Sequence, residues 1–326
     1  MMTDCNTARS MEAPLNVAYM RGIRERIFGE LAKMAQQLGM LMCDEPFVTI
    51  YRTAAEHLFA IENLCCDGDI DPRAWVRTCD ADKPCLPYPR RLRVGFYPIA
   101  ANPLHWGHLL IGLRAMAKLQ LDKVVYVISG RDRRKPDMGC ADQRYIMARD
   151  MLKLFGPLFA CSSLARYSGC DGETNLFRFL KLNRQQPMDM FYIAGGDHYR
   201  RFYPGTEYPD TLVKLELHMD TRIFSYKPAM HAISAAFIER GAGAHEAQVE
   251  TSLAVHFLES LPFAASSTMI RAALDGTGPR SDFAVLPYAA FTDIQALNLY
   301  SRESVIPAIK GQRPRAFSDA STAFAC

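Results

Sequence analysis

The sequence has no apolar run of the length that a membrane-spanning helix needs, about 20 residues, and its formal net charge is only +3. So small a charge gives no electrostatic reason to expect nucleic acid or a membrane surface as a partner. The first 14 residues are polar and lack the charged-then-apolar layout of a secretory signal peptide. We therefore expect a cytoplasmic protein whose partners are neither nucleic acids nor membranes.

The sequence also lacks any C-x-x-C pair, although it contains 10 cysteines. In a reducing compartment such cysteines are thiols rather than disulfides. Six of them precede residue 91, and only His57 lies near them in the sequence, so the spacing of a zinc site is missing. We expect buried or idle thiols and no metal-ligating residues.

The N-terminal part of the chain has the pattern of a helical hairpin. Apolar residues recur at steps of three and four from Ile23 to Leu38 and again from Phe47 to Cys65, which predicts two amphipathic helices within residues 15–66. Pro46 marks the start of the second helix. Proline and charged residues fill 67–90 and predict a linker. We therefore assign 1–90 to a helical extension and linker, 91–300 to a second domain, and 301–326 to a polar, disordered tail.

From residue 91 onward, short apolar runs alternate with helical patterns. The expected strands are 92–97, 124–128, 158–161, 190–194, 222–226 and 255–258, and the expected helices are 105–119, 141–155, 174–182 and 266–274, with Thr174 as a helix cap. Strands separated by helices predict an α/β, Rossmann-like domain with a mainly parallel sheet. In such sheets ligands bind at the carboxyl ends of the strands.

The first candidate site follows the first of these strands. His105 and His108 lie three residues apart on the first turn of a helix, so their rings share one face. The helix N-terminus favours an anion such as phosphate, and Gly107 leaves the backbone between the rings open to a bulky ligand. The alternative is a plain strand–turn–helix junction with two incidental histidines, one of them capping the helix. For Trp106, between them, we favour packing on the sheet over shielding of the site from water.

The second candidate site is the segment Ser266-Ser267-Thr268-Met269-Ile270-Arg271. Ser266 or Ser267 can cap the helix, and Arg271, one turn later, can reach a phosphate bound at the helix N-terminus. The alternative is an ordinary capped helix with an arginine in solvent. Because both segments belong to strand ends of one sheet, we interpret them together as a polyphosphate site.

The two segments resemble known motifs. Asn102-Pro103-Leu104-His105-Trp106-Gly107-His108 resembles the (H/T)-x-G-H motif of the nucleotidyltransferase superfamily, and residues 266–271 resemble its late S-S-T-x-I-R motif. Their order and separation are similar to those of the branch that includes nicotinate-nucleotide adenylyltransferases, as is Gly195-Gly196-Asp197 after a buried strand. The resemblance covers about residues 91–300 and implies a Rossmann-like nucleotidyltransferase fold, preceded here by the helical extension.

The resemblance implies an enzyme of NAD biosynthesis that transfers the adenylyl group of ATP, supplied with Mg²⁺, to the phosphate of nicotinate mononucleotide. The implied catalytic residues are His105, His108 and Arg271. The implied nucleotide-binding residues are Asn102, Gly107, Lys135, Gly195, Asp197, Ser266, Ser267 and Thr268. Lys135 is chosen from the basic segment 129–137 because family members often have a lysine there. Asp197 would bind ribose hydroxyls; its alternative role is a helix cap.

One departure from the family precedes the histidines. Relatives usually carry a Gly-Gly-Thr-Phe run where this chain has Ile99-Ala100-Ala101. The alternatives are therefore a nucleotidyltransferase with another acceptor (nicotinamide mononucleotide, phosphopantetheine or a CTP-using reaction) and a nucleotide-binding sensor without turnover. Retention of all three implied catalytic residues favours an enzyme. Homo-oligomerisation stays open at this level.

Overall fold

The computed structural model describes residues 6–79, 87–130, 138–220, 226–239, 249–297 and 299–300, with the side chains of 6–16 left out. The expected tail at 301–326 and Lys135 lie outside this part of the chain, as does most of the expected strand at 222–226. Within the described residues no helix is both long and apolar enough to cross a membrane.

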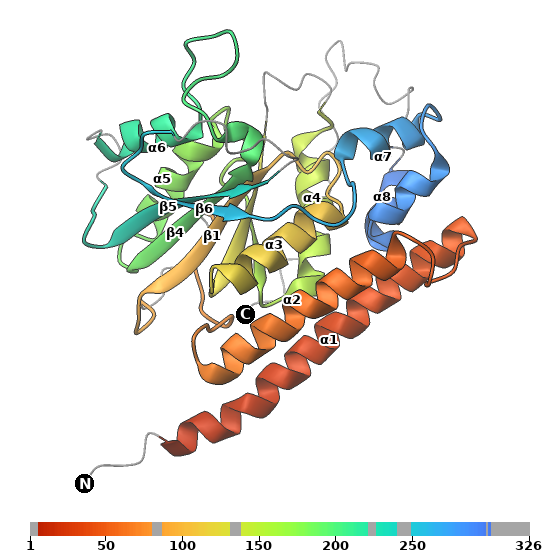
Figure 1. The fold of residues 1–326 in the computed structure, drawn as a ribbon, viewed down its shortest axis with the longest axis horizontal. Helices are drawn as coiled ribbons and strands as arrows, with labels where there is room; N and C mark the ends of the chain where they lie inside the picture. The colour runs from red at the N-terminus through yellow and green to blue at the C-terminus, as the bar shows by residue number, and fades with distance from the viewer. Residues whose placement is uncertain are drawn as a thin grey trace, which may run out of the picture.

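One parallel sheet forms the centre of the molecule (Figure 1). In the described part of the chain it has six strands in the order β3-β2-β1-β4-β5-β6, and each neighbouring pair is parallel. The strands are β1 (Leu92–Ile99), β2 (Lys123–Ile128), β3 (Phe159–Ser162), β4 (Met188–Gly195), β5 (His231–Ile238) and β6 (Ala254–Leu258). The chain moves outward from β1 in one direction and then returns to add β4 on its other side. The predicted α/β class with a parallel sheet is confirmed.

Alternate side chains along the strands fill two hydrophobic clusters, one on each face of the sheet. On β1, Val94 and Phe96 belong to one cluster, whereas Tyr97 and Ile99 belong to the other. The first face is covered by α5 (Gly172–Leu182) and α6 (Thr211–Asp220). The second is covered by α3 (Trp106–Lys118), α4 (Ala141–Leu152) and α8 (Tyr288–Ala296), with α7 (Ser267–Leu274) at its edge (Figure 1).

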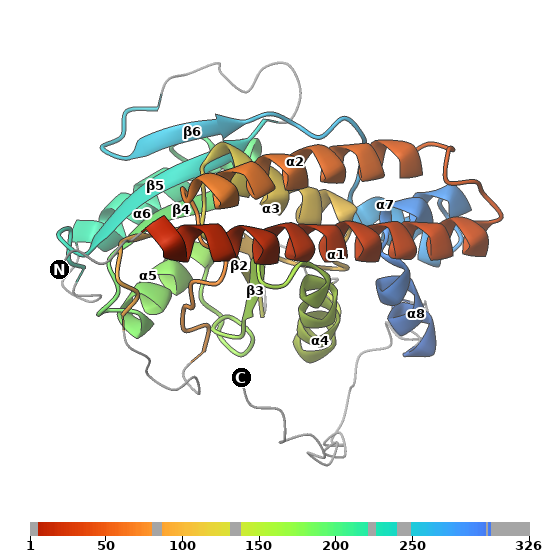
Figure 2. The ribbon, with the colours of Figure 1, turned by 90° about the horizontal axis from the view of Figure 1, so that it is seen from below.

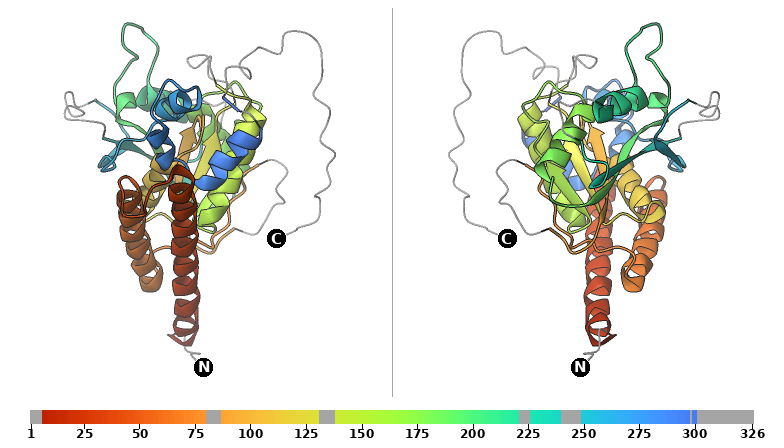
Figure 3. Two further views of the ribbon diagram at one scale, coloured as in Figure 1. Left: turned by 90° about the vertical axis from the view of Figure 1, so that its right-hand side faces the viewer. Right: turned by 90° about the vertical axis from the view of Figure 1, so that its left-hand side faces the viewer.

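The N-terminal extension packs on the helices that cover the second face of the sheet. Helices α1 (Asn6–Leu38) and α2 (Phe47–Asp67) run side by side over the layer that contains α3 (Figure 2), and in both views of Figure 3 the lower end of α1 extends beyond the rest of the chain. Their predicted apolar stripes are buried in the same cluster as Trp106 and Leu113. The carboxylate of Glu30, itself buried, accepts a hydrogen bond of 2.8 Å from the backbone N–H of Ala289 at the start of α8.

Two sequence predictions about individual elements are wrong. The strand β5 at His231–Ile238 was not predicted, because its central Ser234-Ala235-Ala236 interrupts the run of large apolar residues. Tyr226, at the end of the expected strand 222–226, has no strand structure. Helix α5 begins two residues earlier than expected. Its cap is Asp171, whose carboxylate accepts from the backbone N–H of Thr174 at 2.9 Å, so Thr174 is capped rather than capping.

The contact between α2 and α3 predicts a pH-dependent stability. Arg114 on α3 donates from Nε to the His57 ring at 3.2 Å. Burial, together with the charges of Arg114 and Lys118, lowers the pKa of His57 to about 4. Between the unfolded value of about 6.5 and this one, the unfolded chain takes up a proton that the folded chain refuses, so stability falls as the pH falls.

We therefore expect the wild-type protein to lose more stability than His57→Gln as the pH is lowered from about 7 to about 4.5, by on the order of 1–2 kcal/mol after solvent screening. Glutamine keeps an oxygen that accepts from Arg114 but does not titrate. Urea denaturation at each pH measures the difference, and groups other than His57 titrate equally in both proteins. Parallel stability curves for the two proteins would contradict the effect of His57.

Candidate active site

A cavity of about 800 Å³ opens at the carboxyl ends of β1 and β4. These are the neighbouring strands between which the order of the chain reverses, which is where ligands bind in open parallel sheets. The volume lies in the upper part of the range for small-molecule and cofactor sites, about 300–1,000 Å³. Both sequence motifs, together with the end of β4, line this cavity.

The two histidines meet at the N-terminus of α3. His105 occupies the N-cap position with an extended backbone, and α3 begins at Trp106. The centroids of the His105 and His108 rings are 3.9 Å apart, and both residues line the cavity. The structure thus brings the two imidazoles to one face, as their spacing predicts. The helix N-terminus adds a partial positive charge to the same place.

The structure gives a second explanation for glycine at position 107, besides the open backbone that we expected. A Cβ at this position would lie 2.9 Å from Nδ1 of His105 and 3.0 Å from Cβ of Ala265. The missing side chain therefore makes room for the His105 ring and for the segment before α7, in addition to opening the backbone toward the cavity. Glycine is needed here because two parts of the protein itself approach closely.

The second motif lies against the first. Ser266 is the N-cap of α7, and its hydroxyl accepts from the backbone N–H of Met269 at 3.1 Å. The hydroxyl of Ser267 donates to the carbonyl of Pro103 at 2.9 Å. Thr268 also lines the cavity. The N-termini of α3 and α7 consequently converge on one space, and an anion between them would feel both helix dipoles.

Arg271 joins the two motifs rather than pointing only into the cavity. Its Nη1 donates to the carbonyl of Asn102 at 2.7 Å, and its Nη2 lies 3.4 Å from the hydroxyl of Thr268. These contacts use two of the five N–H groups of the guanidinium. The side chain of Asn102 is also engaged, because its Oδ1 accepts from the backbone N–H of Gly139 at 3.0 Å. Asn102 therefore fixes the turn before the histidines.

The end of β4 forms the floor of the cavity. Gly195 is the last residue of β4, and Gly196 begins a short 3-10 helix that contains Asp197. A Cβ on Gly196 would lie 2.8 Å from the carbonyl oxygen of Ile238, so glycine lets the ends of β4 and β5 come together. The Asp197 side chain is half exposed and lines the cavity, where it can accept hydrogen bonds from ligand hydroxyls.

The cavity lining also includes side chains that the sequence reasoning missed. Asp171, the N-cap of α5, and Glu173, in its first turn, line the cavity together with Tyr203. Lys214 lies 3.1 Å from Asp171 and 3.9 Å from Glu173. Burial alone would lower the pKa of Lys214, but the two carboxylates outweigh it and raise this pKa above its ordinary value. The available signal was Asp171-x-x-Thr174, a capping pattern at the start of a helix.

The cavity lining carries groups of both signs. His105, His108 and Arg271 are donors for an anion. Asp171 and Glu173 are carboxylates, of which Lys214 balances only part. The ring of Tyr203 stacks on Tyr208 with centroids 5.3 Å apart and already has the cations of Arg200 and Lys214 over it. The carboxylates can stabilise a positive charge on a ligand. Lys135, expected at this site, lies outside the described residues.

The described residues contain no cluster of three or more His, Cys, Asp or Glu side chains that could hold a metal ion. A divalent cation that enters with a nucleotide would take its ligands mainly from phosphate oxygens and water, as Mg²⁺ commonly does.

Comparison with known proteins finds relatives among curated sequences and among solved structures. No protein-family model matches the chain. A probable nicotinate-nucleotide adenylyltransferase of Thermus thermophilus is 32% identical over 111 residues, which are 33% of this chain and 58% of that protein. A probable nicotinate-nucleotide adenylyltransferase of Clostridium botulinum is 27% identical over 108 residues, 32% of this chain and 52% of that protein. The chain thus spans little more than half the length of these curated relatives.

Among solved structures, the Plasmodium falciparum nicotinic acid mononucleotide adenylyltransferase complexed with NaAD matches with a TM-score of 0.47 and 13% identity, over 64% of this chain and 98% of that chain. The resemblance to nicotinate-nucleotide adenylyltransferases carried by the two motifs is confirmed by the sequence relatives.

Proposed function

We propose that this protein is an adenylyltransferase that moves the adenylyl group of ATP to the phosphate of nicotinate mononucleotide. The observation that carries the proposal is the convergence of two helix N-termini, with His105, His108 and Arg271, on one cavity at the reversal point of the sheet. The sequence relatives, named for this activity, support it.

The proposed reaction is an in-line displacement at the α-phosphorus of ATP. An oxygen of the acceptor phosphate forms the new bond to this phosphorus, and the bond from the phosphorus to the bridging oxygen breaks, so pyrophosphate leaves with its electron pair. The attacking phosphate is already an anion and needs no base from the protein. The protein's task is therefore to position the two phosphates and to stabilise the negative charge that develops on the transferred and leaving groups.

Each element of the site has a part in this chemistry. The ring N–H groups of His105 and His108 donate to oxygens of the α- and β-phosphates, beside the N-terminus of α3. Ser266, Ser267 and Thr268 bring the N-terminus of α7 to the β- and γ-phosphates, and Arg271 bridges the two helices. Mg²⁺, bound to the phosphates of the substrate, offsets part of the charge. Asp197 accepts from ribose hydroxyls, and Lys135 would add a contact to phosphate.

The carboxylates in the cavity lining favour a pyridine mononucleotide as the acceptor. Once attached to ribose, the pyridine ring carries a positive charge, which Asp171 and Glu173 can stabilise. In nicotinate mononucleotide the ring also carries a carboxylate, so these two side chains favour a pyridinium over an uncharged acceptor and do not by themselves select nicotinate over nicotinamide. Phosphopantetheine, the acceptor of a related reaction, has no cationic ring and gains nothing from these groups.

The experiment is a panel of acceptors incubated with Mg-ATP and the full-length protein, with pyrophosphate release as the readout. We expect release with nicotinate mononucleotide and none with phosphopantetheine or without an acceptor. If pyrophosphate is released with nicotinamide mononucleotide alone, the protein is an adenylyltransferase, but its acceptor is nicotinamide mononucleotide. If the protein binds ATP but releases no pyrophosphate with any acceptor, it is a nucleotide sensor and not an enzyme.

A further inference from the structure

We propose that Arg144 is a positioning residue that holds the turn before His105 and His108 in the conformation the site requires. This inference rests on the proposed function. The Arg144 side chain contacts the cavity lining only through backbone atoms. Its hydrogen bonds join three separate segments of the chain.

The guanidinium of Arg144 is bound on all sides by backbone carbonyls. Arg144 lies on α4 and is only 1% exposed. Its Nε donates to Gly139 at 2.8 Å, its Nη2 to Gly130 at 2.6 Å, and its Nη1 to the carbonyl of Ala100. Gly130 follows β2, and Ala100 follows β1. A planar fork of donors can address three segments at once, which a lysine ammonium on a flexible stem does less well.

The turn that Arg144 contacts needs such support. Ala101 has φ +47°, in the left-handed region that a residue with a Cβ enters only at an energetic cost. The carbonyls on both sides of it are bound by arginines, Ala100 by Arg144 and Asn102 by Arg271. The Asn102 side chain is bound as well, by the backbone of Gly139. The left-handed alanine is thus held from both ends.

The turn leads directly to the histidines. Only Asn102, Pro103 and Leu104 separate Ala101 from His105, whose ring lies 3.9 Å from that of His108, centroid to centroid. A shift of the turn is therefore passed on to both imidazoles. Since a misplacement of about 1 Å at a reacting centre can cost about a hundredfold in rate, a residue that fixes this turn controls turnover without touching the substrate.

The positive charge of the Arg144 guanidinium is a second contribution of this residue to the site. Among the described residues its partners are carbonyl oxygens only, with no carboxylate in an ion pair. No carboxylate of the described residues therefore neutralises its positive charge, which stands behind a turn that we expect to face phosphate. Removing the charge should therefore cost more than replacing the guanidinium with another cation.

The test compares Arg144→Lys and Arg144→Gln with matched variants of Arg93. Arg93 also donates to backbone carbonyls, those of Leu119 and Gln120, but at the amino end of β1 and away from the cavity. We expect kcat to fall about tenfold in Arg144→Lys and about a hundredfold in Arg144→Gln, with KM for ATP changed less than about threefold. Arg93→Lys and Arg93→Gln should keep kcat within about twofold at a comparable loss of thermal stability.

A second substitution tests the role of the turn itself. Glycine enters the left-handed region freely, so adding Ala101→Gly to Arg144→Lys should restore kcat at least about threefold, whereas Ala101→Gly alone should change it less than about twofold. This pair carries the test even when Arg144→Gln does not fold. Equal kcat losses in the Arg144 and Arg93 variants would overturn the inference, and so would the absence of any rescue by glycine.

The ring signals of His105 and His108 in NMR spectra separate this inference from the proposed function. They should shift in Arg144→Lys and stay in place in Arg93→Lys, whether or not the wild-type protein releases pyrophosphate. A wild-type protein inactive with every acceptor would end the proposed function. Unmoved histidine signals in Arg144→Lys would end the positioning role.

Discussion

Replacing His108 with alanine is expected to lower kcat for pyrophosphate release by at least about a hundredfold, the scale for losing one donor that stabilises developing charge. The His108 ring lines the cavity beside His105, with ring centroids 3.9 Å apart, at the N-terminus of α3. Its contribution grows as negative charge moves onto the phosphate oxygens in the transition state. The loss should therefore appear in kcat more than in KM for ATP.

The control for this variant is His256→Ala. His256 lies on β6, where its ring packs 5.5 Å from that of Phe191, and it does not line the cavity. We expect His256→Ala to keep kcat within about twofold. Steady-state kinetics with a coupled pyrophosphate assay measures both variants, and thermal unfolding shows whether each remains folded. A His108→Ala enzyme as fast as the wild type would mean that the histidine pair has only a structural role.

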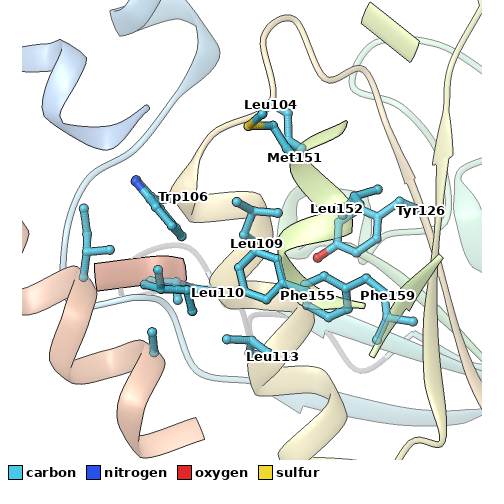
Figure 4. Packing of buried hydrophobic residues seen from close by; sticks show 14 of the residues in the cluster. Leu104, Trp106, Leu109, Leu110, Leu113, Tyr126, Met151, Leu152, Phe155 and Phe159 are labelled. Carbon is cyan, nitrogen blue, oxygen red and sulfur yellow. The ribbon is translucent and has the colours of Figure 1, made fainter. Parts of the chain in front are cut away.

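Replacing Trp106 with alanine is expected to destabilise the protein by about 3–5 kcal/mol, the usual cost of removing a large buried ring. Trp106 stands between the two histidines in the sequence, yet its side chain is 0% exposed. Figure 4 shows it turned away from the turn and into the cluster of Leu109, Leu110 and Phe155. Its ring meets that of Phe155 edge-on, with centroids 6.4 Å apart. Urea denaturation measures the loss.

Two comparisons define the role of Trp106. Its indole Nε1 has no hydrogen-bond partner among the described residues, so Trp106→Phe removes volume without leaving a polar group unpaired, and we expect it to cost less than about 2 kcal/mol. Trp75, the other tryptophan of the chain, is 45% exposed, and Trp75→Ala should change stability by less than about 1 kcal/mol. A Trp106→Phe protein of unchanged stability but without turnover would show that the ring shields the reaction from water instead.

The local elements around the site could be predicted because their signals lie within a few residues. The spacing of His105 and His108 puts both rings on one helix face, and Ser266 caps α7 because its hydroxyl reaches a backbone N–H three residues later. The apolar stripes of α1 and α2 repeat every three or four residues. Where the local signal is weak, as in β5 with its small residues, prediction failed.

The candidate site could be predicted in its parts but not in its assembly. The contacts that join the motifs link residues far apart in the chain: Arg271 to Asn102 across 169 positions and Ser267 to Pro103 across 164. No periodicity connects such residues. The contacts of Arg144 and the carboxylates of Asp171 and Glu173 in the cavity lining were missed for the same reason. Each has the pattern of an ordinary helix residue until another segment packs against it.

The sequence by itself determined the α/β class, the two motifs that we propose to bind phosphate, and the resemblance they carry, because hydrophobic period and helix capping depend on near neighbours. Only the tertiary structure decided which strands neighbour each other, and so where the cavity opens. It also decided that Gly107 makes room for His105 and Ala265, and that a left-handed alanine, Ala101, is held by two arginines. These outcomes depend on packing between distant segments, which only the folded chain brings together.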